Sequence, residues 1–473
     1  MWKNIMLCSK NLLRFSFIRS LGISCLANNH ISRAYSSIIH PKPRPRPKII
    51  QVLSSRHNPN KPNIFSRVGR QFSASPTDWQ RLKPVTDAVN IASSSVSEDG
   101  EFVHVTWDNG ENALYPYAWI RDNCPCTKCF NINEDISERL VPLNEQNLND
   151  KASATTVDES GQSVHVIGTD GHSSPLDASW LFDRQLCRKK PLDGYQPVLW
   201  NAHDIEKAFP MFDYADVLQD NDALKAWLEA LKMYGIAMLQ NAPTKELELI
   251  KLGKRVSFLR EAMWGLISSI KSKPNSYVLA YTPKKILLHS DMMYMSLTPG
   301  VVLLHCLSLP ACTGGENWLV DGFYAAKVLK EKDPQAYDIL TKVKMEHGIT
   351  GIEHGSYFEH RMSKPTISLN EEGDPVCISY HEHLRTSNVS ASSVEEVAEF
   401  YRALKIFSDI LYDPENMYKR RLLEGEIFTV SNIRLLHGRD DFVVSEDKAR
   451  HIESGYLDWD EIDSRLRVLQ RGK

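Results

Sequence analysis

Two segments in the first half of the chain alternate apolar and polar positions, a pattern that predicts β-strands. In EFVHVTWDNGENALYPYAWIRDNC (101–124) the alternation runs on both sides of Asp108-Asn109-Gly110, which is a strong signal for a tight hairpin turn. SVHVIGTDGHSSPLDASWL (163–181) adds another strand and turn. These patterns predict a small β-rich domain over residues 95–190, and we detect no internal repeat in the chain.

The remainder, residues 198–473, mixes helical and extended patterns. DVLQDNDALKAWLEALKMYGIAMLQ has apolar residues at helical spacing, with Asp222 near the helix start and Gly235 ending it before a strand. Further helices are predicted at TKELELIKLGKRVSFL, PQAYDILTKV and SVEEVAEFYRALKIFSDILY, and strands at SYVLAYT, ILLHSDMMYM, GVVLLHCLS, NWLVDGF, EIFTVSNIRLLHGRD and ARHIESGYLDW. Many strands without βαβ alternation predict a mainly β catalytic domain with helical insertions, folded as a double-sheet jelly roll.

Composition narrows the class of protein. With 473 residues, 42% hydrophobic and 24% charged, the chain is long enough for two or three globular domains. A formal net charge of -3 produces no overall field that would favour binding of nucleic acid. The chain contains no run of about eighteen apolar residues, so we predict no transmembrane helix. We therefore expect neither nucleic acid nor a membrane as a partner.

Residues 1–77 contain no Asp or Glu, while Lys and Arg recur throughout the segment. NLLRFSFIRSLGIS within it has an amphipathic character, and Ser is abundant. This composition is typical of a mitochondrial transit peptide, followed here by a disordered linker, and it predicts location in the matrix. A basic disordered tail is the alternative. The mature protein is expected to begin between Ser36 and Thr77.

CPCTKC places Cys124, Cys126 and Cys129 within six residues. Three thiolates so close suit a soft tetrahedral cation such as Zn²⁺, which then needs one more nitrogen or sulfur ligand. His172, in a predicted turn, is the first candidate and His165, in a strand, the second. A closed site of this kind would be structural, although three ordinary reduced cysteines are the alternative.

In ILLHSDMMYM, His289 and Asp291 lie two residues apart, so on an extended strand both side chains would project from one face. NIRLLHGRD adds His437 from the far end of the chain. Two histidines and one carboxylate are the ligands of non-haem Fe(II) oxygenases. Arg450, in another predicted strand, could clamp the distal carboxylate of 2-oxoglutarate, because a planar guanidinium pairs well with a carboxylate. Taken alone, the His and Asp pair could instead be purely structural.

Several segments, in this order, resemble the gamma-butyrobetaine dioxygenase and trimethyllysine dioxygenase family of carnitine-synthesis enzymes. The resemblance covers residues 98–471 and rests on YPYAWIRDNCPCTKC, LWNAHDIEKA, LLHSDMMYM, TGGENWLVDGFYAA, NIRLLHGRD and RHIESGYLDWDEIDSRLRVL, among others. It implies a hydroxylase that uses Fe(II), 2-oxoglutarate and O₂, ascorbate to keep the iron reduced, a zinc-bearing N-terminal domain and a homodimer.

The resemblance also assigns roles to individual residues. It implies that His289, Asp291 and His437 bind iron, that Arg450 and Asn317 bind 2-oxoglutarate, and that Cys124, Cys126, Cys129 and His172 bind zinc. Trp264, Tyr281 and Tyr456 match an aromatic cage, which holds a trimethylammonium group by cation–π attraction.

The sequence departs from the family around the substrate. Ser268 stands where the cage has a tryptophan, His381-Glu382 replaces a pair of asparagines, and an aliphatic residue, Val278, replaces an asparagine that assists the co-substrate. Losing one aromatic face could cost on the order of 1 kcal/mol of cation binding. Within the family, CPCTKC and the C-terminal GYLDWDEIDSRLRVL favour hydroxylation of gamma-butyrobetaine to L-carnitine, whereas the transit segment, LWNA and DGFYAA favour trimethyllysine; we predict the former. Trimethyllysine, another small acid or betaine, and a catalytically inactive metal-binding protein are the alternatives.

Overall fold

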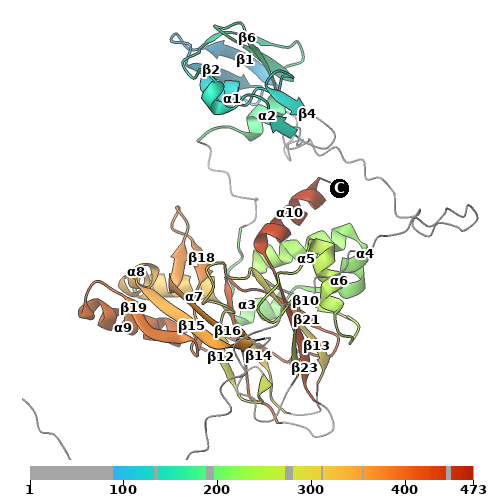
Figure 1. Cartoon of the computed structure of the whole chain (residues 1–473), viewed down its shortest axis with the longest axis vertical. Helices are drawn as coiled ribbons and strands as arrows, with labels where there is room; N and C mark the ends of the chain where they lie inside the picture. The colour runs from blue at the N-terminus through green and yellow to red at the C-terminus, as the bar shows by residue number, and fades with distance from the viewer. Residues whose placement is uncertain are drawn as a thin grey trace, which may run out of the picture. The chain divides into compact units, whose positions relative to one another are not determined.

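The chain folds into two compact units, which are described separately below. The computed structural model describes residues 89–132, 137–187, 196–271, 281–309, 313–353, 356–443 and 449–471. The first unit ends at Arg184 and the second begins at Gln185 (Figure 1). The predicted transit segment, residues 1–77, lies outside the described residues. No helix in these ranges is long and apolar enough to cross a membrane.

The first unit contains two three-stranded antiparallel sheets, as the alternating patterns predicted, and one short two-stranded sheet. Its elements are β1 (Ile91–Val96), β2 (Phe102–Trp107), β3 (Asn112–Pro116), α1 (Tyr117–Asp122), β4 (Phe130–Ile132), β5 (Ser137–Arg139), a 3₁₀ turn at Leu143–Glu145, β6 (Ala152–Val157), β7 (Ser163–Gly168), β8 (Ser173–Asp177) and α2 (Ala178–Asp183). β1, β2 and β3 form one three-stranded sheet, and β6, β7 and β8 form the other. The predicted hairpin turns over Gly110, which has a positive φ of 85°.

Each three-stranded sheet is followed by a short helix, and the two βββα units are copies of one another. Our prediction that the chain has no internal repeat is therefore wrong. Each element from β6 to α2 begins 61 residues after its counterpart from β1 to α1. The strands β2 and β7 also share the same order of buried and exposed positions and the tripeptide Val-His-Val. The repeat is easy to miss because the copies share shape and burial but few identical side chains.

Contacts between the copies follow a pseudo-twofold axis. Ile91 donates its N–H to the carbonyl of Gly161, and Ala152 donates its N–H to the carbonyl of Gly100, which is the equivalent bond with the copies exchanged. The hydroxyl of Ser94 donates to its own counterpart, Thr155, at 2.8 Å. The rings of the equivalent residues Trp119 and Trp180 also meet, with centroids 5.5 Å apart. The two copies therefore share one apolar core.

The second unit is built on two larger sheets. The six-stranded sheet has the order β11 (Ser268–Lys271), β23 (His451–Leu457), β13 (Val301–Ser308), β21 (Ile427–Ser431), β10 (Ile236–Gln240) and β9 (Met211–Asp213), and the four-stranded sheet has the order β12 (Ile286–His289), β22 (Leu435–Arg439), β14 (Asn317–Asp321) and β20 (Tyr418–Arg420). All neighbours are antiparallel except β9 and β10. This arrangement agrees with the predicted mainly β fold class.

Helices cover the outer face of each sheet. Those on the six-stranded sheet are α4 (Tyr214–Gln219), α5 (Asn221–Tyr234), α6 (Glu248–Val256) and α10 (Trp459–Gln470). Those on the four-stranded sheet are α7 (Gly322–Lys332), α8 (Pro334–Lys342) and α9 (Val394–Leu411) (Figure 1). A third apolar cluster, with Met238, Phe428 and Leu435, lies between the sheets. The remaining elements are α3 (Ala202–Lys207), β15 (Lys344–Glu353), β16 (Ser356–Pro365), β17 (Ile367–Leu369), β18 (Pro375–Ile378) and β19 (Arg385–Ser390).

Most predicted elements of the second unit are present, and two differ in an informative way. The helix ending at Gly235 is confirmed, since Gly235 caps α5 with a left-handed φ of 73°. The strand predicted over ILLHSDMMYM ends at His289, because Asp291 lies in a turn. EIFTVSNIRLLHGRD forms two strands, β21 and β22, which belong to different sheets. The strand predicted at SYVLAYT lies almost entirely outside the described residues.

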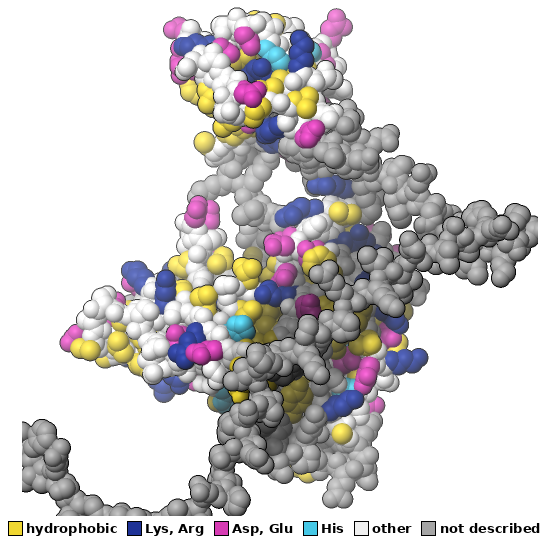
Figure 2. Space-filling model, in the orientation of Figure 1, with side chains coloured by type: hydrophobic (Ala, Val, Ile, Leu, Met, Phe, Trp, Pro, Cys, Tyr) yellow, Lys and Arg dark blue, Asp and Glu magenta, His cyan; other side chains and the backbone are white. Residues whose placement is uncertain are grey.

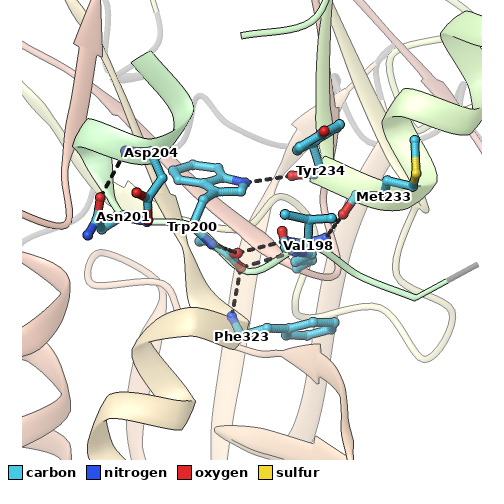
Figure 3. Close-up of polar contacts among 9 residues, drawn as sticks. Val198, Trp200, Asn201, Asp204, Met233, Tyr234 and Phe323 are labelled. Carbon is cyan, nitrogen blue, oxygen red and sulfur yellow. Dashed lines mark hydrogen bonds and ion pairs between the residues drawn. The ribbon is translucent and has the colours of Figure 1, made fainter. Parts of the chain in front are cut away.

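The turn that separates β21 from β22 carries a buried ion pair. Arg434 donates from Nη2 and Nε to both carboxylate oxygens of Asp321, at 2.7 and 3.1 Å, and the two side chains are 4% and 0% exposed. Arg434 also donates to the carbonyls of Met233 and Val198. At the end of α5, Val198 donates its N–H to the carbonyl of Met233, and the Trp200 indole donates to the carbonyl of Tyr234 (Figure 3). At the start of α7, Phe323 donates its N–H to Asp321. One guanidinium thus ties both sheets to α5.

Charged side chains at the surface are mixed in sign. On the visible face of each unit, Lys and Arg alternate with Asp and Glu, and no large area carries one sign alone (Figure 2). This dispersion matches the small net charge of the chain.

We expect Asp321→Asn to lower the free energy of unfolding by about 3 kcal/mol or more, because it leaves the Arg434 charge buried and unpaired. The matched control is Asp409→Asn, which breaks the exposed Lys405–Asp409 pair and should cost less than about 1 kcal/mol. Urea denaturation of the full chain measures both. Equal shifts in the two variants would contradict the argument.

Candidate metal centres and substrate cavity

Pairing of β12 with β22 brings two predicted iron ligands together. His289 lies directly opposite His437 in this antiparallel pair, and the ring centroids are 4.2 Å apart. The strands can approach closely here because Gly438 has no side chain. A Cβ at that position would lie 2.8 Å from the carbonyl oxygen of Ile286. Glycine is the residue that permits two backbones to approach this closely.

Asp291 completes the group from the turn after β12. Its Oδ1 lies 3.3 Å from His289 Nε2 and 3.8 Å from His437 Nε2. Asn432, in the turn between β21 and β22, accepts from the N–H of Asp291 and donates to its carbonyl. The next residue, Met292, has a left-handed φ of 56°. The backbone of Asp291 is therefore fixed on both sides.

The donor set fits a divalent metal such as iron. The three ligand atoms of His289, Asp291 and His437 all lie within 4.8 Å of one another. His289 Nδ1 lies 2.9 Å from the carbonyl of Leu287, and that bond leaves Nε2 with its lone pair. Burial lowers the pKa of His437 to about 4, so the ring is neutral. Burial opposes ionisation of Asp291, but its contacts with His289 and His437 and the hydrogen bond from the Tyr456 hydroxyl hold the pKa of the carboxyl well below the usual range.

A cavity of about 220 Å³ opens beside these ligands. Its lining includes every residue that the resemblance assigned to iron, to 2-oxoglutarate or to the aromatic cage, namely His289, Asp291, His437, Arg450, Asn317, Trp264, Tyr281 and Tyr456. Four of its lining residues, Arg450, Ile452, Ser454 and Tyr456, alternate along β23 and its N-terminal flank. Apolar walls come from Ile270, Ile286, Leu304 and Leu422. One sheet face thus supplies both ionic and aromatic contacts.

Two arginines line the cavity, Arg450, which was predicted from the sequence, and Arg439, which was not. Arg439 is 4% exposed and donates from Nη2 to the carbonyls of Thr282 and Lys284, both at 2.7 Å. Its Nε has no hydrogen-bond partner among the described residues. Arg439 and Arg450 both lie against the Phe442 ring, at 4.8 and 5.8 Å from its centroid. Burial and the nearby Arg450 lower the pKa of Arg439 to about 9.

The signal for Arg439 was present in the sequence. On β22 it lies two residues beyond His437, so both side chains leave the same face of the strand. Two guanidinium groups so close together, at a mostly apolar cavity, favour an anionic occupant that would offset their charge.

Two aromatic residues of the predicted cage, Trp264 and Tyr456, lie close together in the wall of the cavity. The Trp264 and Tyr456 rings are 6.4 Å apart at 47°. Ser268 also lines the cavity, opposite Ser454 in the pairing of β11 with β23, so hydroxyl groups replace an aromatic face there. Asn317 donates its amide to the carbonyl of Arg420 at 3.2 Å, which commits part of its hydrogen-bonding capacity. Val278 lies outside the described residues.

His381 and Glu382 lie beside the cavity rather than among its lining residues. The His381 ring packs against that of His289, with centroids 4.8 Å apart. Glu382 accepts from the Tyr380 hydroxyl and pairs with Arg385 at 3.1 Å. The charge of Glu382 is therefore already balanced by Arg385 in the protein.

A second cluster of ligand atoms lies within the first unit. His172 Nε2 is 3.2, 3.7 and 3.6 Å from the sulfur atoms of Cys124, Cys126 and Cys129. For tetrahedral zinc with typical bond lengths, nitrogen and sulfur ligands are separated by roughly 3.5 Å, so the spacing fits. The alternative ligand His165 lies outside this group, with Nδ1 3.3 Å from the Ser173 hydroxyl.

The electrostatics of this cluster favour a bound cation. Burial raises the pKa of the Cys124 thiol to about 12. Burial also opposes ionisation of Cys126, but the N–H groups of Lys128 and Cys129 are among the contacts that lower its pKa. Arg121 donates to Cys129 Sγ at 2.9 Å. Several thiolates cannot share this space without further positive charge, and a metal ion would supply it.

Comparison with known proteins defines the family. Residues 191–456 match the family described as Taurine catabolism dioxygenase TauD, TfdA, and residues 94–182 match Gamma-butyrobetaine hydroxylase-like, N-terminal. The chain belongs to this dioxygenase family. It is an oxidoreductase, and membership implies Fe(II), 2-oxoglutarate and O₂, in agreement with the His289, Asp291 and His437 donor set.

Named relatives match most of the chain. Gamma-butyrobetaine dioxygenase of Homo sapiens is 32% identical over 81% of this chain and 98% of its own length. The enzyme of that name from Pseudomonas sp. (strain AK-1) is 31% identical over 82% and 97%. Trimethyllysine dioxygenase, mitochondrial, of Homo sapiens is 27% identical over 75% and 82%. The resemblance to the gamma-butyrobetaine and trimethyllysine dioxygenases is thereby confirmed.

Proposed function

We propose that the chain hydroxylates a small trimethylammonium carboxylate, with gamma-butyrobetaine as the first candidate and L-carnitine as its product. One observation carries this proposal. A single cavity combines the His289, Asp291 and His437 group with an arginine that can pair with 2-oxoglutarate and with aromatic side chains that can hold the ammonium group of the substrate. The higher identity to gamma-butyrobetaine dioxygenases supports the same choice.

The residues of the cavity divide the task. His289 Nε2, Asp291 Oδ1 and His437 Nε2 would hold iron, which together with 2-oxoglutarate and O₂ supplies the oxidising power for C–H hydroxylation. Arg450 would pair with a carboxylate of 2-oxoglutarate, assisted by Asn317. Trp264, Tyr281 and Tyr456 would hold the ammonium group, since a quaternary cation cannot donate a hydrogen bond. The apolar walls exclude water and keep one carbon of the substrate in place.

Incubation of the iron-loaded protein with 2-oxoglutarate, ascorbate and each candidate substrate tests the proposal. We expect hydroxylated product and stoichiometric succinate with gamma-butyrobetaine, measured by mass spectrometry. 5,5-Dimethylhexanoate has the same shape without the positive charge and should bind about tenfold more weakly, because cation–π attraction is lost. Product from trimethyllysine alone would favour the alternative substrate.

Two neighbouring variants serve as controls in this assay. Asp291→Ala should abolish product and succinate. Ser290→Ala should retain both, because the Ser290 hydroxyl donates to the carbonyl of Ile378, away from the ligands. Succinate without hydroxylation of any candidate would retain the dioxygenase chemistry and refute the substrate.

We also propose that Cys124, Cys126, Cys129 and His172 bind a structural Zn²⁺. The support is a closed set of four donors, three of them sulfur, with no position left for a substrate. Such an ion would stabilise a unit whose own core is small.

Metal analysis of the purified chain tests the zinc site. We expect about one zinc per chain, and none after Cys126→Ser. Cys187→Ser is the matched control, because Cys187 is exposed and lies outside the cluster, so its zinc content should equal that of the wild type. Undiminished zinc in Cys126→Ser would rule out the site.

We further infer import into the mitochondrial matrix. The support is the absence of Asp and Glu from residues 1–77, together with relatives that are named mitochondrial. Mass spectrometry of the protein from isolated mitochondria should find a mature N-terminus between Ser36 and Thr77. Recovery of the intact N-terminus from the cytosol would refute the inference.

A further inference from the structure

Tyr456 contacts both the metal ligands and the substrate cavity. It lies on β23, is 4% exposed, and donates its hydroxyl to Asp291 Oδ2 at 2.9 Å. The other carboxylate oxygen, Oδ1, is the one that faces His289 and His437. The two oxygens of Asp291 therefore have separate partners, with Oδ1 left to the metal.

The hydroxyl of Tyr456 provides the remaining restraint on Asp291. Asn432 holds the Asp291 backbone on both sides, but it does not contact the carboxylate in the described part of the chain. The carboxylate could still rotate and present both oxygens to a metal. A hydrogen bond from a buried phenol to Oδ2 opposes that rotation, and hydrogen bonds of this kind commonly orient metal ligands.

The aromatic ring of the same residue forms part of the cavity wall. It faces Trp264 and packs with Met292 and Val302 in one apolar cluster. A molecule in the cavity would therefore press on the ring whose hydroxyl restrains a metal ligand. Tyr456 therefore belongs to the residues proposed for the aromatic cage and also donates a hydrogen bond to a ligand carboxylate.

We propose that Tyr456 is a positioning residue that holds Asp291 as a one-oxygen metal ligand and couples occupancy of the cavity to the metal site. The coupling rests on the proposed function, since it requires a substrate in contact with the ring. The restraint on Asp291 does not, because it depends only on the metal ligands. The two parts can be tested separately.

Tyr456→Phe removes the hydroxyl and keeps the ring. Titration with Mn²⁺, followed by electron paramagnetic resonance, should give a dissociation constant about tenfold higher than in the wild type. Thiolate sites disfavour Mn²⁺, so the cysteine cluster does not interfere. Binding of gamma-butyrobetaine should change by less than about threefold, because the aromatic face remains. Succinate formed per product should rise.

Tyr294→Phe is the matched control. Tyr294 is also 4% exposed and belongs to the same apolar cluster, but its hydroxyl makes no hydrogen bond with Asp291 in the described structure. Its Mn²⁺ affinity should remain within about twofold of the wild type. Tyr456→Leu, which removes the ring as well, should weaken both metal and substrate binding.

The Mn²⁺ titration tests whether Tyr456 restrains Asp291, and it does so without requiring catalytic turnover. A dissociation constant for Tyr456→Phe equal to that of the wild type would overturn the positioning role, as would an equal loss in Tyr294→Phe. If the wild type hydroxylates none of the candidate substrates, the proposed function fails while the Mn²⁺ result still stands. If Tyr456→Phe bound the metal normally but lost substrate binding, Tyr456 would contribute to the cavity wall and not to the position of Asp291.

Discussion

A buried ion pair between Arg434 and Asp321 supports the arrangement of the catalytic unit. Arg434 lies in the short turn where the chain passes from one sheet to the other, and Asp321 ends β14 while also accepting from the N–H of Phe323 at the start of α7. The same turn carries Asn432, which fixes Asp291. An ion pair that is almost fully buried is stable only when its hydrogen-bonding groups have partners. Here the carbonyls of Met233 and Val198 accept hydrogen bonds from Arg434. The geometry of the His289, Asp291 and His437 group thus depends on a contact between residues that do not line the cavity.

The two faces of strand β23 make different contacts, one with the cavity and the other with the helices. Ile452, Ser454 and Tyr456 face the cavity, whereas Glu453 and Leu457 face the helices. Glu453 accepts from the N–H of Leu247, which precedes α6 and has a left-handed φ of 71°. Helix packing on the outer side therefore sets the position of the strand that lines the cavity.

Local patterns in the sequence were enough to predict most strands and helices and to propose the residues that line both sites. They failed where tertiary contacts decide the outcome. Asp291 leaves the strand because Asn432, far along the chain, holds it in a turn, and the contact between Tyr456 and Asp291 spans 165 residues. The long hairpin of β15 and β16 also escaped prediction, since its strands mix polar and apolar positions on both faces. Ser268 could be read as a departure, but its position opposite Ser454 required the sheet pairing.

The duplicated βββα unit of the N-terminal domain has a consequence for its cysteine cluster. Cys124, Cys126 and Cys129 follow α1 of the first copy, whereas His172 lies in the hairpin turn of the second copy, so one ion would bridge the two. By sequence alone, Gln185, Cys187 and Glu111 stand 61 residues from Cys124, Cys126 and His172, which is the spacing that relates the two copies. A frame made of two copies offers two places for the same chemistry. Among the described residues, the full set of ligand side chains is the one formed by Cys124, Cys126, Cys129 and His172, and Cys187 is a cysteine at a matching sequence position.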